Sequence, residues 1–151
     1  LAVSGELDRT LGGPSANLDN ANFKRRTVYG FVSRHRLDEL LRLFDFPDPN
    51  ITAADRSVTT VPLQQLFVLN SDFMTQRARA LTNRVNAAGL ADDPAKVRYA
   101  YELLFSREAS DDEVETATLF LESGKDDGDK ISRWEQLSLA LLSSNEFLFV
   151  D

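Results

Sequence analysis

Helix-forming patterns dominate the second half of the chain and constrain its fold more than any other feature of the sequence. Between residues 62 and 142, apolar side chains recur at the spacing of amphipathic helices. Residues that begin or end helices separate these runs: Ser110 and Glu113 match a capping box, and Gly89 can follow a last turn. We therefore predict a mainly α fold, a compact bundle of about five helices. The predicted helical stretches are 37–44, 62–89, 92–105, 110–124 and 131–142, and Asn70-Ser71-Asp72 can end one helix and cap the next within 62–89.

The segment 27–33 has a different pattern. Its β-branched and aromatic residues favour a strand, although Val28, Phe31 and Val32 also fit one helical face. We expect one minor β element there, a short strand or extended segment. The polar stretch 47–61 is expected to be a long connection, and long ordered connections are often functional.

Composition excludes several classes of site. The 151 residues fit one domain, they include no cysteine, and His35 is the only histidine. Disulfides, thiolate metal sites, c-type haem attachment and a site with several histidine ligands from one chain are therefore excluded. A net charge of −7 argues against general nucleic-acid binding, and no apolar stretch reaches the roughly 20 residues of a membrane span. We expect no cofactor, no metal, no nucleic-acid partner and no membrane span.

Positive charge is concentrated near the first third of the chain. Residues 24–42 contain six cations and two anions. Arg25, Arg26 and Arg34 could bind the sulfate or carboxylate groups of an anionic polysaccharide, because guanidinium donates to such groups in pairs. The alternative, which we favour, is that these arginines pair with aspartates such as Asp45 inside the domain or remain solvated.

A carboxylate pair suggests a second kind of site. Asp45 and Asp55, with Arg56 nearby, could act as acid and base in glycoside hydrolysis, which needs two carboxyl groups about 5–10 Å apart. Asp45 also fits a structural role, because an aspartate between Phe44 and Phe46 can cap a turn between two buried rings. We favour the structural role.

Several short blocks of sequence, taken in order, resemble one known family. Residues 25–34 read Arg-Arg-Thr-Val-Tyr-Gly-Phe-Val-Ser-Arg, and the last eight read Ser-Asn-Glu-Phe-Leu-Phe-Val-Asp. The chain resembles the C-terminal domain of unknown function of large secreted planctomycete proteins, which commonly carry a cytochrome c-type domain and a second uncharacterised domain upstream. The resemblance implies that the chain is the C-terminal part of a longer domain and is exported to the periplasm or cell envelope. The other blocks lie at 43–48, 56–65, 69–70, 103–108 and 111–113.

These observations favour a non-catalytic structural or interaction module and leave catalysis open. We expect residues 1–151 to form a single domain that docks on the upstream part of its own polypeptide or on an envelope partner. Leu1 to Leu11, Phe147 and Phe149 are the predicted docking surface, because they would otherwise expose apolar patches. A homodimer of the chain could cover the same surface. The alternative is a carbohydrate-active domain that uses Asp45 and Asp55 with the nearby arginines.

Overall fold

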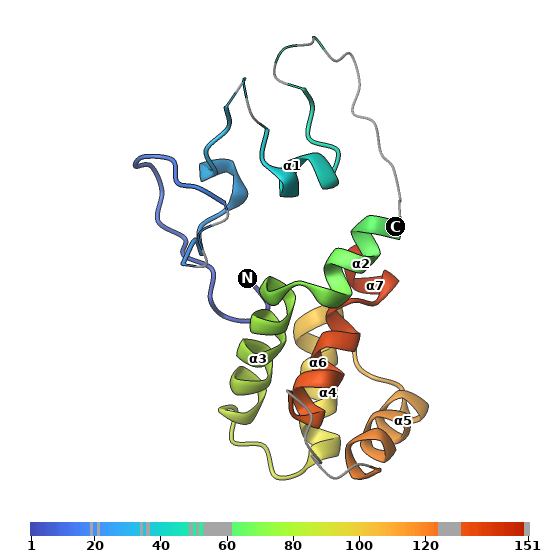
Figure 1. The fold of residues 1–151 in the computed structure, drawn as a ribbon. Coiled ribbons are helices and arrows are strands. Elements are labelled where there is room, and N and C mark those ends of the chain that lie inside the picture. Colours follow the sequence, from blue (N-terminus) through green and yellow to red (C-terminus); the bar gives the residue numbers. More distant parts are fainter. Residues whose placement is uncertain are drawn as a thin grey trace. The chain divides into compact units, whose positions relative to one another are not determined.

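The computed structural model describes residues 1–18, 20, 22–33, 35, 37–48, 50, 52, 62–123 and 131–149 (Figure 1). This part of the chain is mainly helical, as the sequence predicts, and it forms two compact units. The first unit contains Leu1–Glu6 and Leu69–Asp151, and the second contains Leu7–Val68. The helices are α1 (Glu39–Leu43), α2 (Pro62–Asn70), α3 (Asp72–Asn86), α4 (Asp93–Phe105), α5 (Asp111–Glu122), α6 (Arg133–Leu142) and α7 (Asn145–Leu148).

The helix starts follow local capping rules. Ser110 and Glu113 form the predicted capping box of α5: the Ser110 hydroxyl accepts from the Glu113 N–H at 3.2 Å, and the Ser110 N–H donates to the Glu113 carboxylate at 2.8 Å. Ser132 and Glu135 form a second capping box at the start of α6. Each capping box satisfies backbone groups within a stretch of four residues, so it can be predicted from the local sequence.

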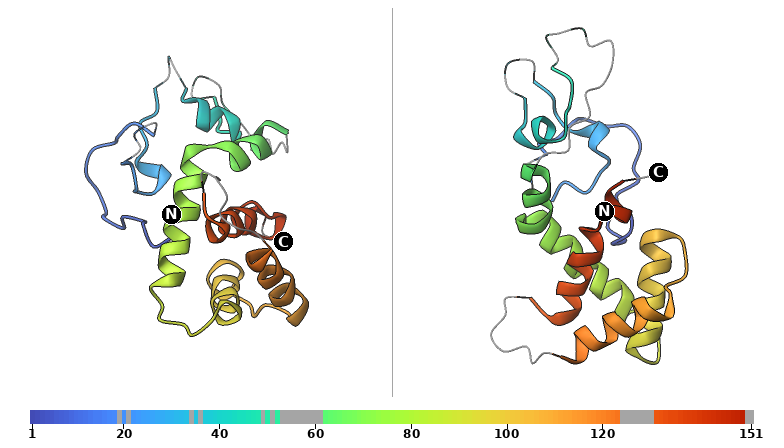
Figure 2. Two further views of the ribbon diagram at one scale, coloured as in Figure 1. Left: turned by 60° about the horizontal axis from the view of Figure 1, so that its bottom comes forward. Right: turned by 90° about the vertical axis from the view of Figure 1, so that its right-hand side faces the viewer.

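The core of the first unit lies where α3 packs along α6, with α4 and α5 beside this pair (Figure 2). Leu81 and Val85 of α3 and Val97 of α4 are completely buried. A buried pair of hydroxyls joins the two central helices, with Thr82 Oγ1 2.9 Å from Ser138 Oγ. The position of α6 therefore depends on its contact with α3.

The segment Leu1–Glu6 packs on α3. The Arg77 guanidinium is 6% exposed and lies 2.9 Å from the Glu6 carboxylate. Arg84 donates to the Val3 carbonyl at 2.7 Å, and Gly5 adopts a φ of 78° close to the Arg84 side chain. The first residues of the predicted docking surface thus form part of the first unit.

The second unit consists largely of irregular backbone. Of the minor β element expected at 27–33, the described residues show an isolated bridge between Gly30 and Ala16 and no longer strand, since Thr27–Tyr29 is a 3-10 helix. The Tyr29 hydroxyl accepts from the Gly12 N–H at 3.1 Å, which links this turn to the preceding loop. Gly30 approaches Leu18 closely: a Cβ at this position would lie 2.6 Å from Leu18 Cδ2, so a larger residue would displace that side chain.

None of the helices in the described part of the chain is long and apolar enough to cross a membrane. Most of the predicted 47–61 connection lies outside the described residues.

Candidate functional site

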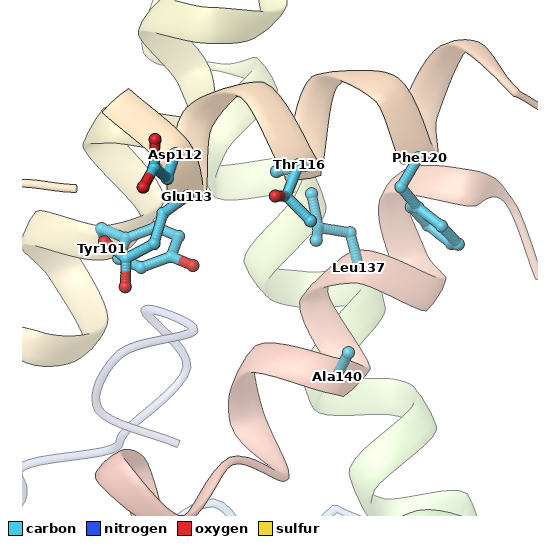
Figure 3. A pocket seen from close by; sticks show the side chains of 8 residues that line it. Tyr101, Asp112, Glu113, Thr116, Phe120, Leu137 and Ala140 are labelled. Atoms are coloured by element: carbon cyan, nitrogen blue, oxygen red, sulfur yellow. The ribbon is translucent and has the colours of Figure 1, made fainter. Parts of the chain in front are cut away.

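An apolar groove of about 380 Å³ opens in the first unit between α5 and α6 (Figure 3). Tyr101 of α4 lies at one end and Phe120 of α5 at the other. Ala117 and Leu137 are buried between these rings. The complete lining is Tyr101, Asp112, Glu113, Thr116, Ala117, Phe120, Leu137 and Ala140.

The groove exists because small side chains face each other across it. Thr116 and Ala117 on α5 are opposite Ala140 on α6, and both Thr116 and Ala140 are exposed. Residues one helical turn apart share a helix face, so each wall is a short ridge of apolar or small groups. The exposed side chain of Leu119, at 57% accessibility, lies on the same helix three positions after Thr116.

Each aromatic end of the groove is covered by an arginine. The Arg107 guanidinium carbon lies 5.4 Å from the centre of the Tyr101 ring, and that of Arg133 lies 5.3 Å from the Phe120 ring. Both distances fit cation–π contacts, which attract the cation to the ring face. Tyr101 is fixed further by an edge contact with Phe105, with ring centres 5.2 Å apart.

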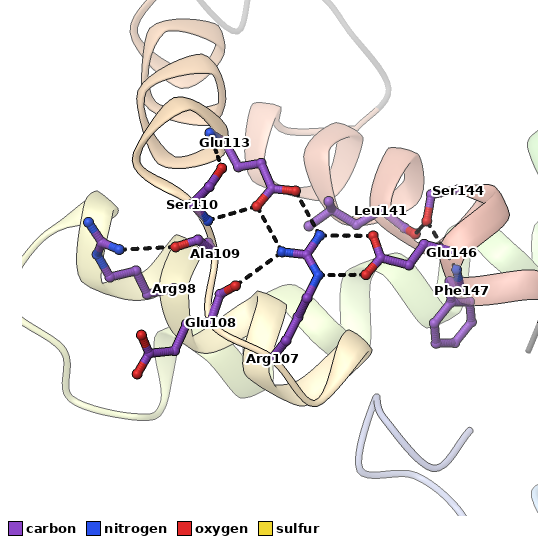
Figure 4. A network of polar contacts seen from close by, with 10 residues as sticks. All are labelled: Arg98, Arg107, Glu108, Ala109, Ser110, Glu113, Leu141, Ser144, Glu146 and Phe147. Carbon is purple, nitrogen blue, oxygen red and sulfur yellow. Dashed lines mark hydrogen bonds and ion pairs between the residues drawn. The ribbon is translucent and has the colours of Figure 1, made fainter. Parts of the chain in front are cut away.

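Arg107 links α5 to α7 through two carboxylates (Figure 4). Its Nη1 and Nη2 donate to Glu113 at 2.9 and 2.7 Å, and its Nε and Nη2 donate to Glu146 at 2.6 and 2.9 Å. The Glu108 carbonyl accepts a fifth bond at 3.0 Å. A planar guanidinium can hold both carboxylates at once because its donors form a rigid fork.

These bonds change the protonation of the groups beside the groove. Hydrogen bonds from Arg107 lower the pKa of Glu113 to about 2, and they also lower the pKa of Glu146. The pKa of Arg107 is raised by the same pairs. Burial raises the pKa of Tyr101, and the negative charge of Glu113 adds to that effect. Both carboxylates therefore remain charged near neutral pH.

The Tyr101 end of the groove is acidic. Asp112 lines it, is exposed, and pairs with no cation among the residues that the structure describes. Together with Glu113 and Glu146 it supplies three negative charges against the one positive charge of Arg107. The charged side chains named here therefore carry a net charge of −2, which the positive N-terminus of α5 offsets in part.

The predicted cation site is only partly within the described residues. Arg25 donates to the carbonyls of Thr10, Gly12 and Pro14, and its guanidinium lies 3.8 Å from the centre of the Tyr29 ring. It therefore organises its own loop, and among the described residues it forms no ion pair with Asp45.

Arg26 precedes the 3-10 helix and is exposed, which leaves it accessible to an anion. Arg34, Arg56 and Asp55 lie outside the described residues.

Asp45 ends α1 in a left-handed conformation, with a φ of 56°. The Asp45 N–H donates to the Arg42 carbonyl at 3.4 Å and the Phe46 N–H donates to the Leu41 carbonyl at 2.9 Å, which is the pattern of a Schellman motif. The structural role of Asp45 thus agrees with the turn interpretation. That interpretation assumed that both flanking rings are buried. In the structure they are partly exposed, Phe44 by 37% and Phe46 by 39%.

The second unit contains a more polar pocket of about 570 Å³ that the sequence did not reveal. Phe31, 59% exposed, faces a site shared with Asp38 and Glu39, and the Asp38 carboxylate also caps α1 by accepting from the Leu40 N–H at 2.9 Å. The other lining residues are Ser15, Ala16, Asn17, Ser33 and Leu37.

The predicted apolar docking residues have different environments. Phe149 is 48% exposed, Phe147 is half-buried, and Leu11 is 80% exposed. The described residues contain no group of three or more carboxylate or histidine side chains able to hold a metal ion. The acidic turn 126–129 lies outside them.

Comparison with known proteins gives one match. The family model described as "PSD1: Protein of unknown function (DUF1553)" matches residues 1–121. The matched region includes the α5 wall of the groove, and α6 follows it. No curated protein and no solved structure matches the chain.

Proposed function

We propose that this chain, which belongs to the PSD1 family of proteins of unknown function (DUF1553), is a non-catalytic interaction module that docks on the upstream part of its own polypeptide. In this proposal the protein is exported and acts in the periplasm or cell envelope, and the chain needs no cofactor. The observation that carries the proposal is the apolar groove between α5 and α6.

The charged groups around the groove support docking over catalysis. Glu113 is fully engaged by Arg107 and the Ser110 N–H, and its low pKa makes it a poor proton donor at neutral pH. The walls between Tyr101 and Phe120 are apolar, and burial of such surface is the main driving force of association. Phe149, predicted as a docking residue, exposes 48% of its surface and is a second apolar group accessible to a partner.

Calorimetric titration of the chain with the purified upstream region of its parent protein tests this function. We expect binding with a negative heat-capacity change, which marks apolar burial. Ala140→Arg should weaken binding by about tenfold or more, because it places a charge in the groove. Ala88→Arg is the matched control, since Ala88 is exposed and does not line the groove.

Absence of binding, or equal affinity of the two arginine variants, would contradict the proposal. Self-association that disappears in Ala140→Arg alone would replace the upstream region with a second copy of the chain as the partner.

A second function, carbohydrate binding, is supported by the pocket of the second unit. An exposed aromatic ring can stack on a sugar ring, and a carboxylate can accept hydrogen bonds from the sugar hydroxyls. In this pocket Phe31 would stack on the sugar and Glu39 would accept from its hydroxyls. Titration with neutral and sulfated oligosaccharides should show binding that Phe31→Ala abolishes, and unchanged binding by that variant would exclude this site.

A further inference from the structure

The chemistry of the groove specifies its partner more narrowly than the proposed function does. We infer, on the basis of that function, that the α5–α6 groove binds an amphipathic helix that carries two large apolar side chains and a lysine or arginine next to them. The inference depends on the shape of the groove, the backbone of its walls and the charge at its Tyr101 end.

The volume of the groove sets the number of apolar groups it takes. A cavity of roughly 150 Å³ accommodates one benzene-sized group. The groove has about 380 Å³ and an aromatic ring at each end, Tyr101 and Phe120. Two large side chains from the partner would therefore fill it.

The walls favour a helix as the partner. Both walls are helices, so their backbone N–H and carbonyl groups are already bonded within α5 and α6 and offer no strand edge for β-augmentation. Recognition must use side chains. The ridge of Thr116 and Phe120 on one wall and that of Leu137 and Ala140 on the other have the spacing into which the ridge of a third helix packs.

The charge at the Tyr101 end requires a cation on that helix. Asp112, Glu113 and Glu146 outnumber the single guanidinium of Arg107, and Asp112 is exposed on the groove wall without a cation partner among the described residues. A lysine or arginine beside the apolar side chains would pair with Asp112. An acidic side chain at the same place would be repelled.

Two designed peptides test the inference with the complete chain. They share one ridge of leucines at helical spacing, and they differ only in flanking lysines or flanking glutamates. Fluorescence anisotropy should show that the lysine peptide binds about tenfold more tightly at low salt and that this advantage shrinks at high salt.

Variants of α5 locate the charge effect. Asp112→Lys should weaken binding of the lysine peptide by roughly fivefold, and Asp112→Asn should weaken it less. Glu115→Lys is the matched control, because it makes the same charge change on the same helix at an exposed position outside the groove lining. Ala140→Arg should abolish binding of either peptide.

The outcomes separate the inference from the proposed function. Equal binding of both peptides, lost in Ala140→Arg, would refute the requirement for a cation and leave apolar docking intact. Binding of the lysine peptide that survives Ala140→Arg, or responds equally to Asp112→Lys and Glu115→Lys, would also overturn the inference. If neither peptide binds, the inference is wrong, whereas the titration with the upstream region still decides the proposed function.

Discussion

Replacing Ser138 by alanine should destabilise the first unit, because it removes the partner of a buried hydroxyl. Thr82 is 6% and Ser138 is 3% exposed, and their hydroxyl oxygens are 2.9 Å apart between α3 and α6. A buried polar group left without a partner costs about 1–3 kcal/mol. The higher helix propensity of alanine offsets roughly 0.5 kcal/mol of this cost.

The companion change Thr82→Val should cost about 1–3 kcal/mol for the same reason, since it leaves the Ser138 hydroxyl unpaired. The double variant removes both hydroxyls and leaves no orphaned group. We therefore expect it to be much less destabilised than the sum of the two single changes, with a coupling energy of at least about 1 kcal/mol.

Urea unfolding followed by the fluorescence of Trp134 measures this cycle. Trp134 is the only tryptophan of the chain and lies on α6, so its signal reports on the helix that Ser138 occupies. Additive effects in the double variant, or single variants as stable as the parent chain, would show that the two hydroxyls do not stabilise the α3–α6 contact.

Three further predictions follow from burial and charge. The pKa of Glu113 falls from its ordinary value of 4.5 in the unfolded chain to about 2 in the folded chain. Its pairing with Arg107 therefore stabilises the folded state fully above about pH 4.5, and this stabilisation is lost as the pH falls toward 2. The stability difference between the parent chain and Glu113→Gln in urea should therefore shrink with acidification, and a constant difference would refute this. Leu81→Ala should lower the free energy of unfolding by about 2–5 kcal/mol in the same assay, because Leu81 is buried. Leu119→Ala should lower it by less than about 0.5 kcal/mol, because Leu119 is exposed. Arg25→Ala should speed amide hydrogen exchange in residues 10–13, because Arg25 holds this loop through the carbonyls of Thr10, Gly12 and Pro14, and unchanged exchange would contradict that role.

The helices were predictable because their signals are local. The capping box of Ser110 and Glu113 spans four residues, and the apolar stripe of α3 repeats within single turns. The turn at Asp45 could also be anticipated, since it depends on an aspartate adopting a left-handed conformation after five helical residues. These features need no information from distant parts of the chain.

The site could not be predicted, because it depends on residues that only folding brings together. Arg107 and Glu146 are separated by 39 positions, and nothing in their local sequence indicates that they pair. The segment 27–33 shows the same limit of local signals: its one β-bridge joins Gly30 to the distant Ala16, while Thr27–Tyr29 forms a 3-10 helix. The one available signal for the groove was the presence of Ala117 and Ala140 within otherwise large apolar stripes.

The way α5 is held explains how an apolar groove can persist in a folded chain. At one end Arg107 binds Glu113, and at the other Arg133 covers Phe120, so polar contacts fix the helix at both ends. Between these points Ala117 of α5 and Ala140 of α6 are too small to fill the space between the two helices. A protein core reaches close packing with larger side chains that interdigitate, and each unfilled volume forgoes dispersion contacts. A partner that supplies the missing side chains would recover these dispersion contacts, which is the physical basis of the docking proposed for this groove.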